Sequence, residues 1–270
     1  MYKLKRALNL GALFCPLVYL WLPLPAQASI LCPASAVDET AIVRGVTDGD
    51  TLRLEDGRKV RLIGINSPEL ARDNRQAQPL ANEAKQTLYR LLAESGNRVN
   101  LQYGNERFDT YRRTLAHIYL TDGRSIQALL LEQGMATAYT TPPNADRSDC
   151  YRRAEQQAMQ QRRGLWALSE YQAKTLSQLG RQEEGFRLIR GRVSRIERSS
   201  GASWIMLNEK LKIRIASNDL IYFRQSWLQS LPGKQIEVRG WLHPEQNRYF
   251  MQLRHPDAVQ LLDTTPAAAK

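Results

Sequence analysis

Histidine and cysteine are both scarce in this 270-residue chain, which contains three of each. His117 stands in a strand-like segment, and His243 and His255 stand in the C-terminal part without partners. The sequence therefore suggests neither a histidine metal cluster nor a Ser-His-Asp arrangement. The interior of the chain also lacks low-complexity tracts, and its hydrophobic (43%) and charged (24%) fractions are ordinary for a globular protein. This composition excludes wholesale disorder and a multi-span membrane protein.

A long unbroken hydrophobic run is missing as well, because prolines interrupt the apolar stretch of residues 7–25. A helix that spans a bilayer needs roughly 20 apolar residues. The stretch follows a basic start and precedes Ala26-Gln27-Ala28, an A-x-A cleavage pattern. Residues 1–28 are therefore predicted to be a signal peptide, and an uncleaved anchor is the alternative. We expect an exported protein, periplasmic or extracellular, with no stable membrane insertion after cleavage.

Acidic residues are fewer than basic ones, 27 against 38, which gives a formal net charge of +11. Cleavage after Ala28 would remove Lys3, Lys5 and Arg6 and no acidic residue, so the charge would fall to +8. A basic exported protein suits polyanionic partners such as DNA or RNA. A soluble surface with surplus cations is the alternative, and no protein partner can be inferred.

The cysteines reduce to one pair if the leader is removed. Cys15 lies in the leader, so Cys32 and Cys150 remain. An even pair in an oxidising compartment predicts a disulfide. Closing so long a loop would stabilise the fold by ~3–5 kcal/mol.

The region 41–166 has the element order of an OB-type barrel. Short alternating segments separated by Asp-Gly turns predict strands, and a helical pattern of leucines predicts a helix after the third strand. Three strands, a helix and two strands predict a five-stranded barrel in a mainly β, α+β class, followed by two helices. The expected strands are 41–47, 51–56, 58–65, 97–104 and 113–120, and the expected helices are 79–95, 125–133 and 148–163.

A polar connector at 167–185 precedes a second, smaller OB-like β-barrel at 186–264. Alternation within this unit points Lys210, Lys212 and Arg214 outward. This basic face could follow a phosphate backbone, or it could be a solvated edge. The expected strands are 187–196, 203–208, 210–216, 234–243 and 248–253, with a helix at 220–231.

Polar residues with phosphodiesterase chemistry gather around the first barrel. Hydrolysis of a phosphodiester needs a hard cation, donors that offset charge on phosphorus, and a group that orients water. Carboxylates and carbonyls suit Ca²⁺ or Mg²⁺, and arginine grips phosphate bidentately. Each residue alone also fits a turn or an exposed strand position. The cluster consists of Asp48, Asp50, Arg61, Asn66, Ser67, Glu69, Asp109, Tyr111 and Arg113.

These residues stand in motifs that resemble the staphylococcal nuclease family from about Ile42 to Trp166. The motifs are the DGDT turn, the RLIGINSPE segment, a Tyr-x-Arg segment at 111–113 and the closing Gly-Leu-Trp at 164–166. They occur in the family order with compatible spacing. The resemblance implies an OB-type barrel and a metal-dependent phosphodiesterase that leaves 3′-phosphates.

The resemblance also implies roles for individual residues. The metal, Ca²⁺ ahead of Mg²⁺, would be bound by Asp50, Asn66 and the Ser67 carbonyl, with Asp48 behind these ligands. Arg61 and Arg113 would stabilise the transition state, and Glu69 would be the water-orienting base. The chain also offers residues that could border the substrate groove, namely Tyr111, Arg112 and Tyr139.

Two positions depart from the family pattern. Asn66 stands where the family usually has Asp, so the site loses a formal charge and calcium binding is expected to weaken. Arg112 stands where Gly is common and could add a phosphate contact. Two functions thus remain open: a secreted calcium-dependent nuclease acting on DNA and/or RNA, and a catalytically silent OB-fold module that binds nucleic acid or envelope polyanions. A structural envelope protein without polyanion affinity is a third reading.

Overall fold

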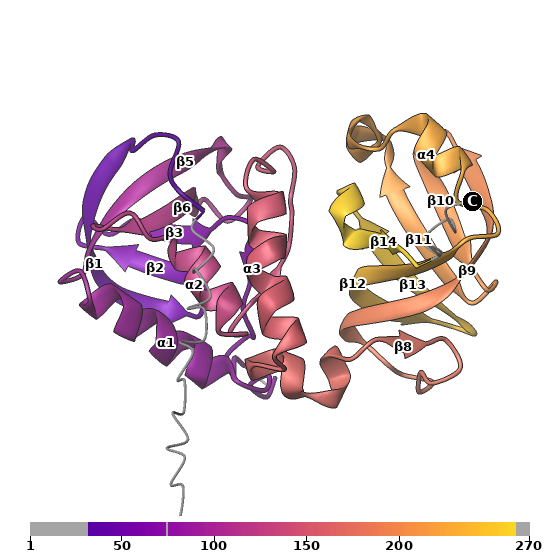
Figure 1. The fold of residues 1–270 in the computed structure, drawn as a ribbon, viewed down its shortest axis with the longest axis horizontal. Helices are drawn as coiled ribbons and strands as arrows, with labels where there is room; N and C mark the ends of the chain where they lie inside the picture. The colour runs from indigo at the N-terminus through magenta and orange to yellow at the C-terminus, as the bar shows by residue number, and fades with distance from the viewer. Residues whose placement is uncertain (1–31, 74, 263–270) are drawn as a thin grey trace, which may run out of the picture.

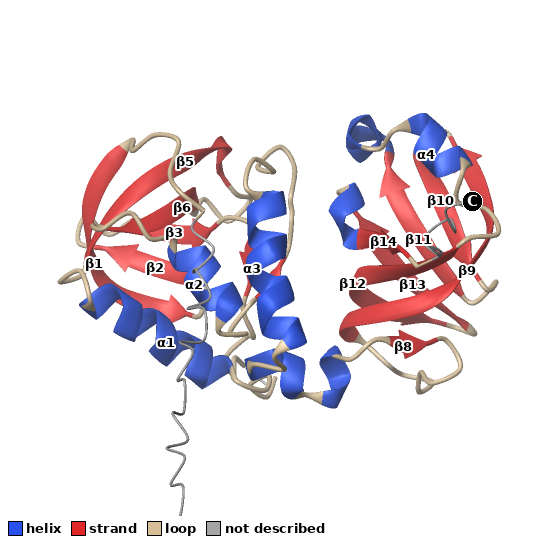
Figure 2. Ribbon diagram, viewed as in Figure 1, coloured by secondary structure: helices blue, strands red, loops and turns tan. Residues whose placement is uncertain are grey.

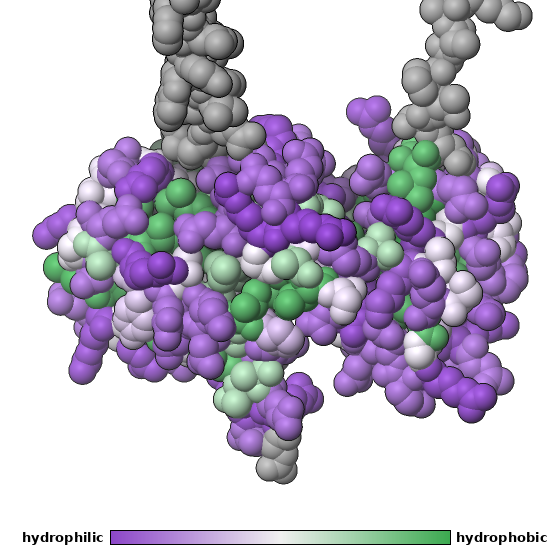
Figure 3. All heavy atoms as spheres, turned by 60° about the horizontal axis from the view of Figure 1, so that its bottom comes forward, coloured by the Kyte–Doolittle hydropathy of each residue, from purple (hydrophilic) through white to green (hydrophobic). Residues whose placement is uncertain are grey.

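The computed structural model describes residues 32–73 and 75–262, so the predicted signal peptide and Cys15 lie outside the described residues. These residues form two β-barrels that are joined by short helical turns (Figure 1). No described helix is long and apolar enough to cross a membrane. In the view of Figure 3 both lobes carry a mainly hydrophilic surface with scattered hydrophobic patches.

The first barrel is closed, in the strand order β1-β2-β3-β6-β5. Neighbouring strands are antiparallel except β3 and β6, which pair in parallel. Alternating apolar residues fill the interior, and Leu52, Val60, Leu101 and Ile118 are completely buried. The predicted five-stranded barrel is confirmed. Its strands are β1 (Glu39–Asp48), β2 (Thr51–Leu54), β3 (Lys59–Leu62), β5 (Arg98–Phe108) and β6 (Thr114–Leu120).

Three helices pack around this barrel (Figure 2). Helix α1 (Ala81–Ala93) buries Ala84, Leu88, Leu91 and Leu92 on one face. Leu80, which the leucine spacing also assigned to this face, lies outside the helix with a left-handed backbone, so α1 is shorter than the predicted 79–95. Helices α2 (Ile126–Glu132) and α3 (Ser148–Gln160) pack against each other.

The predicted disulfide is present and fixes the start of the first unit to α3. Cys32 and Cys150 are bonded, with their Cα atoms 5.8 Å apart. The sulfur pair joins the hydrophobic core of the first barrel. The bond closes a loop over a sequence separation of 118 residues.

A two-stranded ribbon that the sequence did not predict joins the candidate site to the middle of the chain. Strand β4 (Ile65–Asn66) pairs with β7 (Thr137–Ala138), which places Asn66 opposite Thr137. The Tyr139 backbone N–H also donates to the Gly64 carbonyl at 2.9 Å. Residues 137–139 therefore lie beside the loop that carries the expected metal ligands.

The predicted connector is partly structured. Turns η1 (Gly164–Ala167) and η2 (Ser169–Tyr171) lead into β8 (Lys174–Thr175), which pairs in parallel with β9 (Gly185–Ser199). The end of the connector thus adds a strand to the second sheet. The boundaries 41–166, 167–185 and 186–264 stay our proposed division of the chain.

The second barrel closes through β9, β10, β11, β13 and β12, because β12 pairs with both β13 and β9. The predicted second barrel is confirmed. The expected helix at 220–231 is shorter than predicted, since extended backbone at Phe223 and Arg224 separates two helical turns. The remaining elements are β10 (Ala202–Leu207), β11 (Leu211–Ala216), η3 (Ser217–Tyr222), α4 (Gln225–Gln229), β12 (Gln235–Glu245), β13 (Arg248–Leu253), η4 (Pro256–Ala258) and β14 (Val259–Leu261).

A buried ion pair links the two barrels. The two terminal nitrogens of Arg239 on β12, Nη1 and Nη2, donate to the carboxylate of Glu155 on α3 at 2.5 and 2.6 Å. Glu155 is fully buried and Arg239 is 6% exposed. The same carboxylate contacts Arg152 and accepts the Ala138 backbone N–H at 2.8 Å. Burial raises the pKa of Glu155 to about 7, and Arg152 and the Ala138 amide oppose this rise.

Candidate active site at the open end of the first barrel

The tight turn between β1 and β2 brings Asp50 into contact with the loop after β3. One carboxylate oxygen of Asp50 accepts the Ser67 backbone N–H at 2.7 Å, and the side chain is buried. This approach requires glycine at position 49, because a Cβ there would lie 2.7 Å from the Cβ of Ser67 and 2.8 Å from that of Ala84. The DGDT turn therefore locks the two loops together.

Arg61 joins Asp50 to Asn66. Its Nε lies 3.2 Å from the second carboxylate oxygen of Asp50, and its Nη2 donates to the Asn66 side-chain oxygen at 3.2 Å. The Asn66 amide nitrogen donates in turn to the Ser67 carbonyl at 3.2 Å. The structure therefore brings together four of the predicted site residues, Asp50, Arg61, Asn66 and Ser67.

Asp48 is a second carboxylate beside this cluster, close enough to Asp50 for their charges to interact. A side-chain oxygen of Asp48 accepts the Asp50 backbone N–H at 3.1 Å. Burial, and then the charge of Asp50, raise the pKa of Asp48 to about 6. Two neighbouring carboxylates in a partly buried turn make a local negative field that a cation would relieve.

Arg113 approaches from the β5–β6 turn. Its Nε lies 2.6 Å from the Asp109 carboxylate, which also accepts the Arg113 backbone N–H. Its Nη1 reaches Thr51 Oγ1 at 3.5 Å, and Thr51 donates to Asp50 at 3.1 Å. Tyr111 is 80% exposed and lies with its ring 5.6 Å from the Arg113 guanidinium carbon. Arg113 is thus held at the edge of the Asp50 cluster.

Glu69 projects into solvent two residues after Ser67. Its side chain is exposed and forms no ion pair within the described part of the chain. Its backbone is fixed, because Gln78 accepts the Glu69 N–H through its side chain and donates its own N–H to the Glu69 carbonyl, both at 2.9 Å. A solvent-facing carboxylate on a fixed backbone is suited to accept a proton from water.

The three expected groove residues have different surroundings. Tyr111 lies next to Arg113, as described. Arg112 is exposed in the turn, with a φ of 61°. Tyr139 is half-buried against the second barrel, with its ring 4.8 Å from the ring of Trp241 and nearly perpendicular to it. Burial raises the pKa of Tyr139. The second barrel therefore covers one side of Tyr139.

The three candidate ligands offer oxygen atoms of the kind that a hard divalent cation binds, but only Asp50 carries a formal charge. The Asp50 carboxylate and the Ser67 carbonyl are oxygen donors of the type that calcium prefers. Asn66 turns its oxygen to Arg61 and its nitrogen to Ser67. Rotating the amide would free its oxygen for a cation and place its N–H groups against the Arg61 guanidinium. No described group of three or more His, Cys, Asp or Glu side chains is placed to hold a metal ion.

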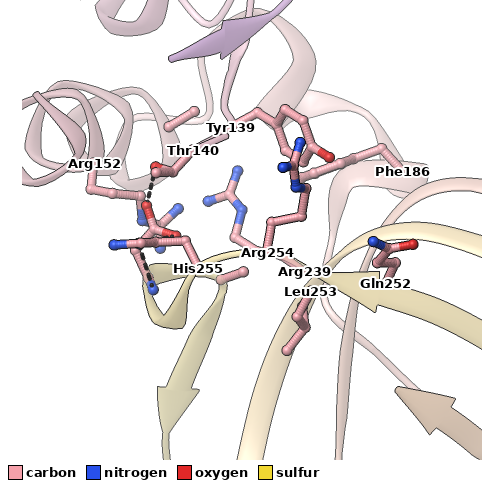
Figure 4. A pocket seen from close by; sticks show the side chains of 12 residues that line it. Tyr139, Thr140, Arg152, Phe186, Arg239, Gln252, Leu253, Arg254 and His255 are labelled. Atoms are coloured by element: carbon pink, nitrogen blue, oxygen red, sulfur yellow. Dashed lines mark hydrogen bonds and ion pairs between the residues drawn. The ribbon is translucent and has the colours of Figure 1, made fainter. Parts of the chain in front are cut away.

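A cavity of about 210 Å³ begins at the candidate ligands and extends to the second barrel. Asn66 and Ser67 line one side, and Arg187 and Trp241 line another. A second and smaller cavity, about 20 Å³, lies between the barrels (Figure 4). There Tyr139 and Thr140 from the first unit face side chains of the second, and Thr140 contacts Asp257.

Sequence reasoning missed residues that support the site from a distance. Thr51 bridges Asp50 and Arg113, and it belongs to the DGDT motif that identified the turn. Gln78 holds the Glu69 backbone from nine residues away, and no local pattern marks it. Trp241 and Arg187 belong to the second barrel, so only the packing of the two units reveals them.

Comparison with known proteins identifies the family. A family model described as staphylococcal nuclease homologue matches residues 59–168. The chain is 34% identical over 131 residues to a thermonuclease from Staphylococcus intermedius, which covers 47% of this chain and 76% of that protein. The chain belongs to the staphylococcal nuclease family.

Further relatives agree with this membership. A thermonuclease from Staphylococcus hyicus is 31% identical over 138 residues, covering 50% of this chain and 79% of its own. The endonuclease YncB of Bacillus subtilis is 34% identical over 128 residues, covering 46% and 60%. As a member of the family the chain is a hydrolytic nuclease. The second barrel lies outside the residues that the family model matches.

Proposed function

We propose that this chain is an exported, calcium-dependent endonuclease that hydrolyses phosphodiester bonds of DNA and/or RNA and leaves 3′-phosphates. The observation that carries the proposal is the contact set in which buried Asp50 holds both Arg61 and the Ser67 loop. This contact set supports the proposal, because carboxylate and carbonyl oxygens of the kind that calcium prefers lie beside a guanidinium of the kind that grips phosphate. Family membership supplies the reaction class.

Residues of the chain would divide the work as follows. Arg61 and Arg113 donate to the non-bridging phosphate oxygens and offset the charge that builds on them in the transition state. Glu69 accepts a proton from a water molecule while the water oxygen forms a bond to phosphorus. The bond from phosphorus to the 5′-oxygen breaks, and that oxygen takes a proton from solvent. The products are a 3′-phosphate and a 5′-hydroxyl.

A bound calcium ion would be held by Asp50, the Ser67 carbonyl and Asn66, with Asp48 behind them. It would supply positive charge to a phosphate oxygen. Asp109 is a positioning residue, because it fixes the Arg113 guanidinium through a 2.6 Å ion pair. Thr51 connects the two halves of the site.

The test is release of acid-soluble nucleotides from single-stranded DNA by residues 29–270, with calcium titrated against a chelator. We expect release that depends on calcium and that drops by about 10²–10⁴-fold in Glu69→Gln. Product ends that accept a 5′-label without phosphatase treatment would agree with 5′-hydroxyl and 3′-phosphate termini. Binding of DNA without release at any calcium or magnesium concentration would contradict the proposal and favour the silent binding module.

Export is tested separately. The Cys32–Cys150 disulfide supports an oxidising compartment. We expect the protein recovered from the periplasm or medium of the producing cell to begin at Ser29. An intact Met1 on a cytoplasmic protein with three free thiols, those of Cys15, Cys32 and Cys150, would contradict export.

A further inference from the structure

One outer face of the second barrel combines aromatic rings with cations. Strand register places Phe250 of β13 between Lys212 of β11 and His243 of β12. In the next row along the strands, Arg214 of β11 lies opposite Trp204 of β10. Because side chains alternate between faces along a strand, these five side chains project from the same side of the sheet. We call this set the aromatic track: Trp204, Lys212, Arg214, His243 and Phe250.

Contacts join four of the five side chains of the aromatic track, namely Lys212, Trp204, Phe250 and His243. The Lys212 ammonium lies 4.1 Å from the centre of the Trp204 ring. The rings of Trp204 and Phe250 are 6.4 Å apart, and those of His243 and Phe250 are 6.3 Å apart. Trp204 and Phe250 are only half-buried. The rings therefore form a platform that solvent reaches.

The cations of the aromatic track are free to bind an anion. Within the described residues, Lys212 and Arg214 form no ion pair with a carboxylate. Of the acidic residues on the neighbouring strands, Glu197 is paired with Arg195 and Glu237 with Arg190, and Glu245 lies at the end of β12 in register with Arg248. Neither Lys212 nor Arg214 is therefore neutralised by an ion pair among the described residues.

The aromatic track leads toward the candidate active site. Trp241 lines the cavity that also contains Asn66 and Ser67. His243 lies two residues further along β12, so both side chains leave the same face of this strand. A ligand that left the site along this face would meet Trp241 first and then the ring of Phe250.

We propose that the aromatic track binds a single-stranded segment of the nucleic acid that the first barrel cuts. The identity of the ligand rests on the proposed nuclease function, and the site itself rests on the second barrel. Stacking of bases on aromatic rings combined with cations along the backbone is the physical basis of single-strand binding. A duplex hides the faces of its bases, so the platform selects unpaired substrate.

The test separates binding from cleavage. Each variant is made in the full mature chain with Glu69→Gln, and binding of a fluorescein-labelled 20-nucleotide oligothymidylate is measured by anisotropy in a chelator. We expect Trp204→Ala and Phe250→Ala each to raise Kd about tenfold or more. Trp204→Phe and Phe250→Tyr should keep most of the affinity, because they preserve a ring.

The cations give a second, independent measurement. Lys212→Gln and Arg214→Gln should each reduce the slope of log Kd against log salt by about 0.7, the value for one phosphate contact on a single strand. Arg198→Gln is the matched control, since Arg198 lies on β9 and is exposed on the side opposite Glu197. Its salt slope should equal that of the parent.

The outcomes also separate this proposal from the nuclease assignment. Unchanged Kd in both alanine variants, or competition by a 20-base-pair duplex as strong as by the single strand, would overturn the aromatic track. Loss of binding in these variants would support the track even if the parent chain without Glu69→Gln cleaved nothing.

Discussion

The two barrels share one topology and differ in what their loops carry. The order β1-β2-β3-β6-β5 of the first barrel corresponds to β9-β10-β11-β13-β12 of the second. Even the parallel pair recurs, as β3 with β6 and as β11 with β13. The turn between the first two strands reads Asp48-Gly49-Asp50 in the first barrel and Ser199-Ser200-Gly201 in the second. A carboxylate turn is thus present in one barrel and missing from the other.

This difference shows that the same barrel fold can hold different functional side chains, so the fold alone does not determine the function. In the first unit the turn carries buried Asp50 and contacts the Ser67 loop. In the second unit the side chains of the aromatic track project from the outer face of the sheet. One barrel is therefore suited to hydrolysis and the other to holding a strand. The predictions below test this division, from the largest expected effect to the smallest.

The largest effect concerns the pair that joins the barrels. Glu155→Met leaves Arg239 buried without a carboxylate and should lower the free energy of unfolding by about 3–5 kcal/mol. Arg239→Met should cost less, because Glu155 keeps its contacts with Arg152 and the Ala138 N–H. The double variant should lose less than the sum of the two, because it removes both members of the buried pair and leaves only the partly buried Arg152 without its carboxylate. Urea unfolding of all four proteins measures this coupling.

The control for this cycle is Arg195, whose ion pairs with Glu197 and Glu209 are exposed. Arg195→Met should change the stability far less than either buried variant. Additive losses in the Glu155 and Arg239 cycle would show that the two barrels are not coupled through this pair.

The next effect tests the chemistry of the first barrel. Arg113→Lys keeps the charge and loses the planar, two-pronged donor, so kcat on single-stranded DNA should fall by about 10²–10³-fold. Arg98→Lys is the matched control, because Arg98 is exposed at the start of β5 and its described contacts are made by the backbone. Equal kcat in both variants would remove Arg113 from the catalytic site.

A smaller effect concerns acid stability of the first barrel. His117 is buried with Nδ1 2.8 Å from the Tyr151 hydroxyl, and burial, followed by the charge of Arg147, lowers its pKa from 6.5 to about 3. In the unfolded chain His117 binds a proton below about pH 6.5, whereas in the folded chain it stays neutral down to about pH 3. The folded state is therefore destabilised relative to the unfolded state as the pH falls from 6.5 to 3.

Linkage sets the size of this effect at about 2 kcal/mol between pH 7 and pH 5. His117→Gln keeps a hydrogen-bonding side chain and cannot titrate, so its unfolding free energy should fall less over the same interval. Urea unfolding at pH 7, 6 and 5 makes the comparison. Identical pH slopes in the two proteins would contradict a neutral His117 in the folded state.

The smallest effect sharpens the metal site. Asn66→Asp adds a formal charge and a second oxygen that can face Arg61 and a cation together, so calcium affinity should rise about tenfold, or ~1.4 kcal/mol. Calorimetric titration with calcium alone measures this without turnover. Asn100→Asp on β5 is the control, and equal gains in the two variants would point to a general charge effect.

Much of the fold was predictable because its signals are local. Alternation of apolar residues along short segments gave both barrels, and the leucine spacing of α1 gave its buried face. The disulfide followed from cysteine parity once the leader was set aside. The helix expected at 220–231 was too long, because extended backbone at Phe223 and Arg224 is not marked by glycine or proline.

The residues of the candidate site that stand in short motifs could be predicted from the sequence, whereas the long-range contacts that hold the site could not. Asp50, Arg61, Asn66 and Ser67 stand in two short motifs, so the sequence indicated their contact. The Glu155–Arg239 pair and the ribbon of β4 with β7 join residues 84 and about 70 positions apart. Such contacts depend on how helices and strands pack in the folded protein, and a local sequence pattern does not predict this packing.

The division between a cutting barrel and a holding barrel is tested most directly by comparing long and short substrates. We would measure kcat/KM in calcium on a 60-nucleotide single strand and on a trinucleotide, for the parent chain, Glu69→Gln and the double variant Trp204→Ala with Phe250→Ala. The account predicts that Glu69→Gln loses activity on both substrates and that the double variant loses activity only on the long strand. Equal losses on both substrates in the double variant, or an active Glu69→Gln, would contradict it.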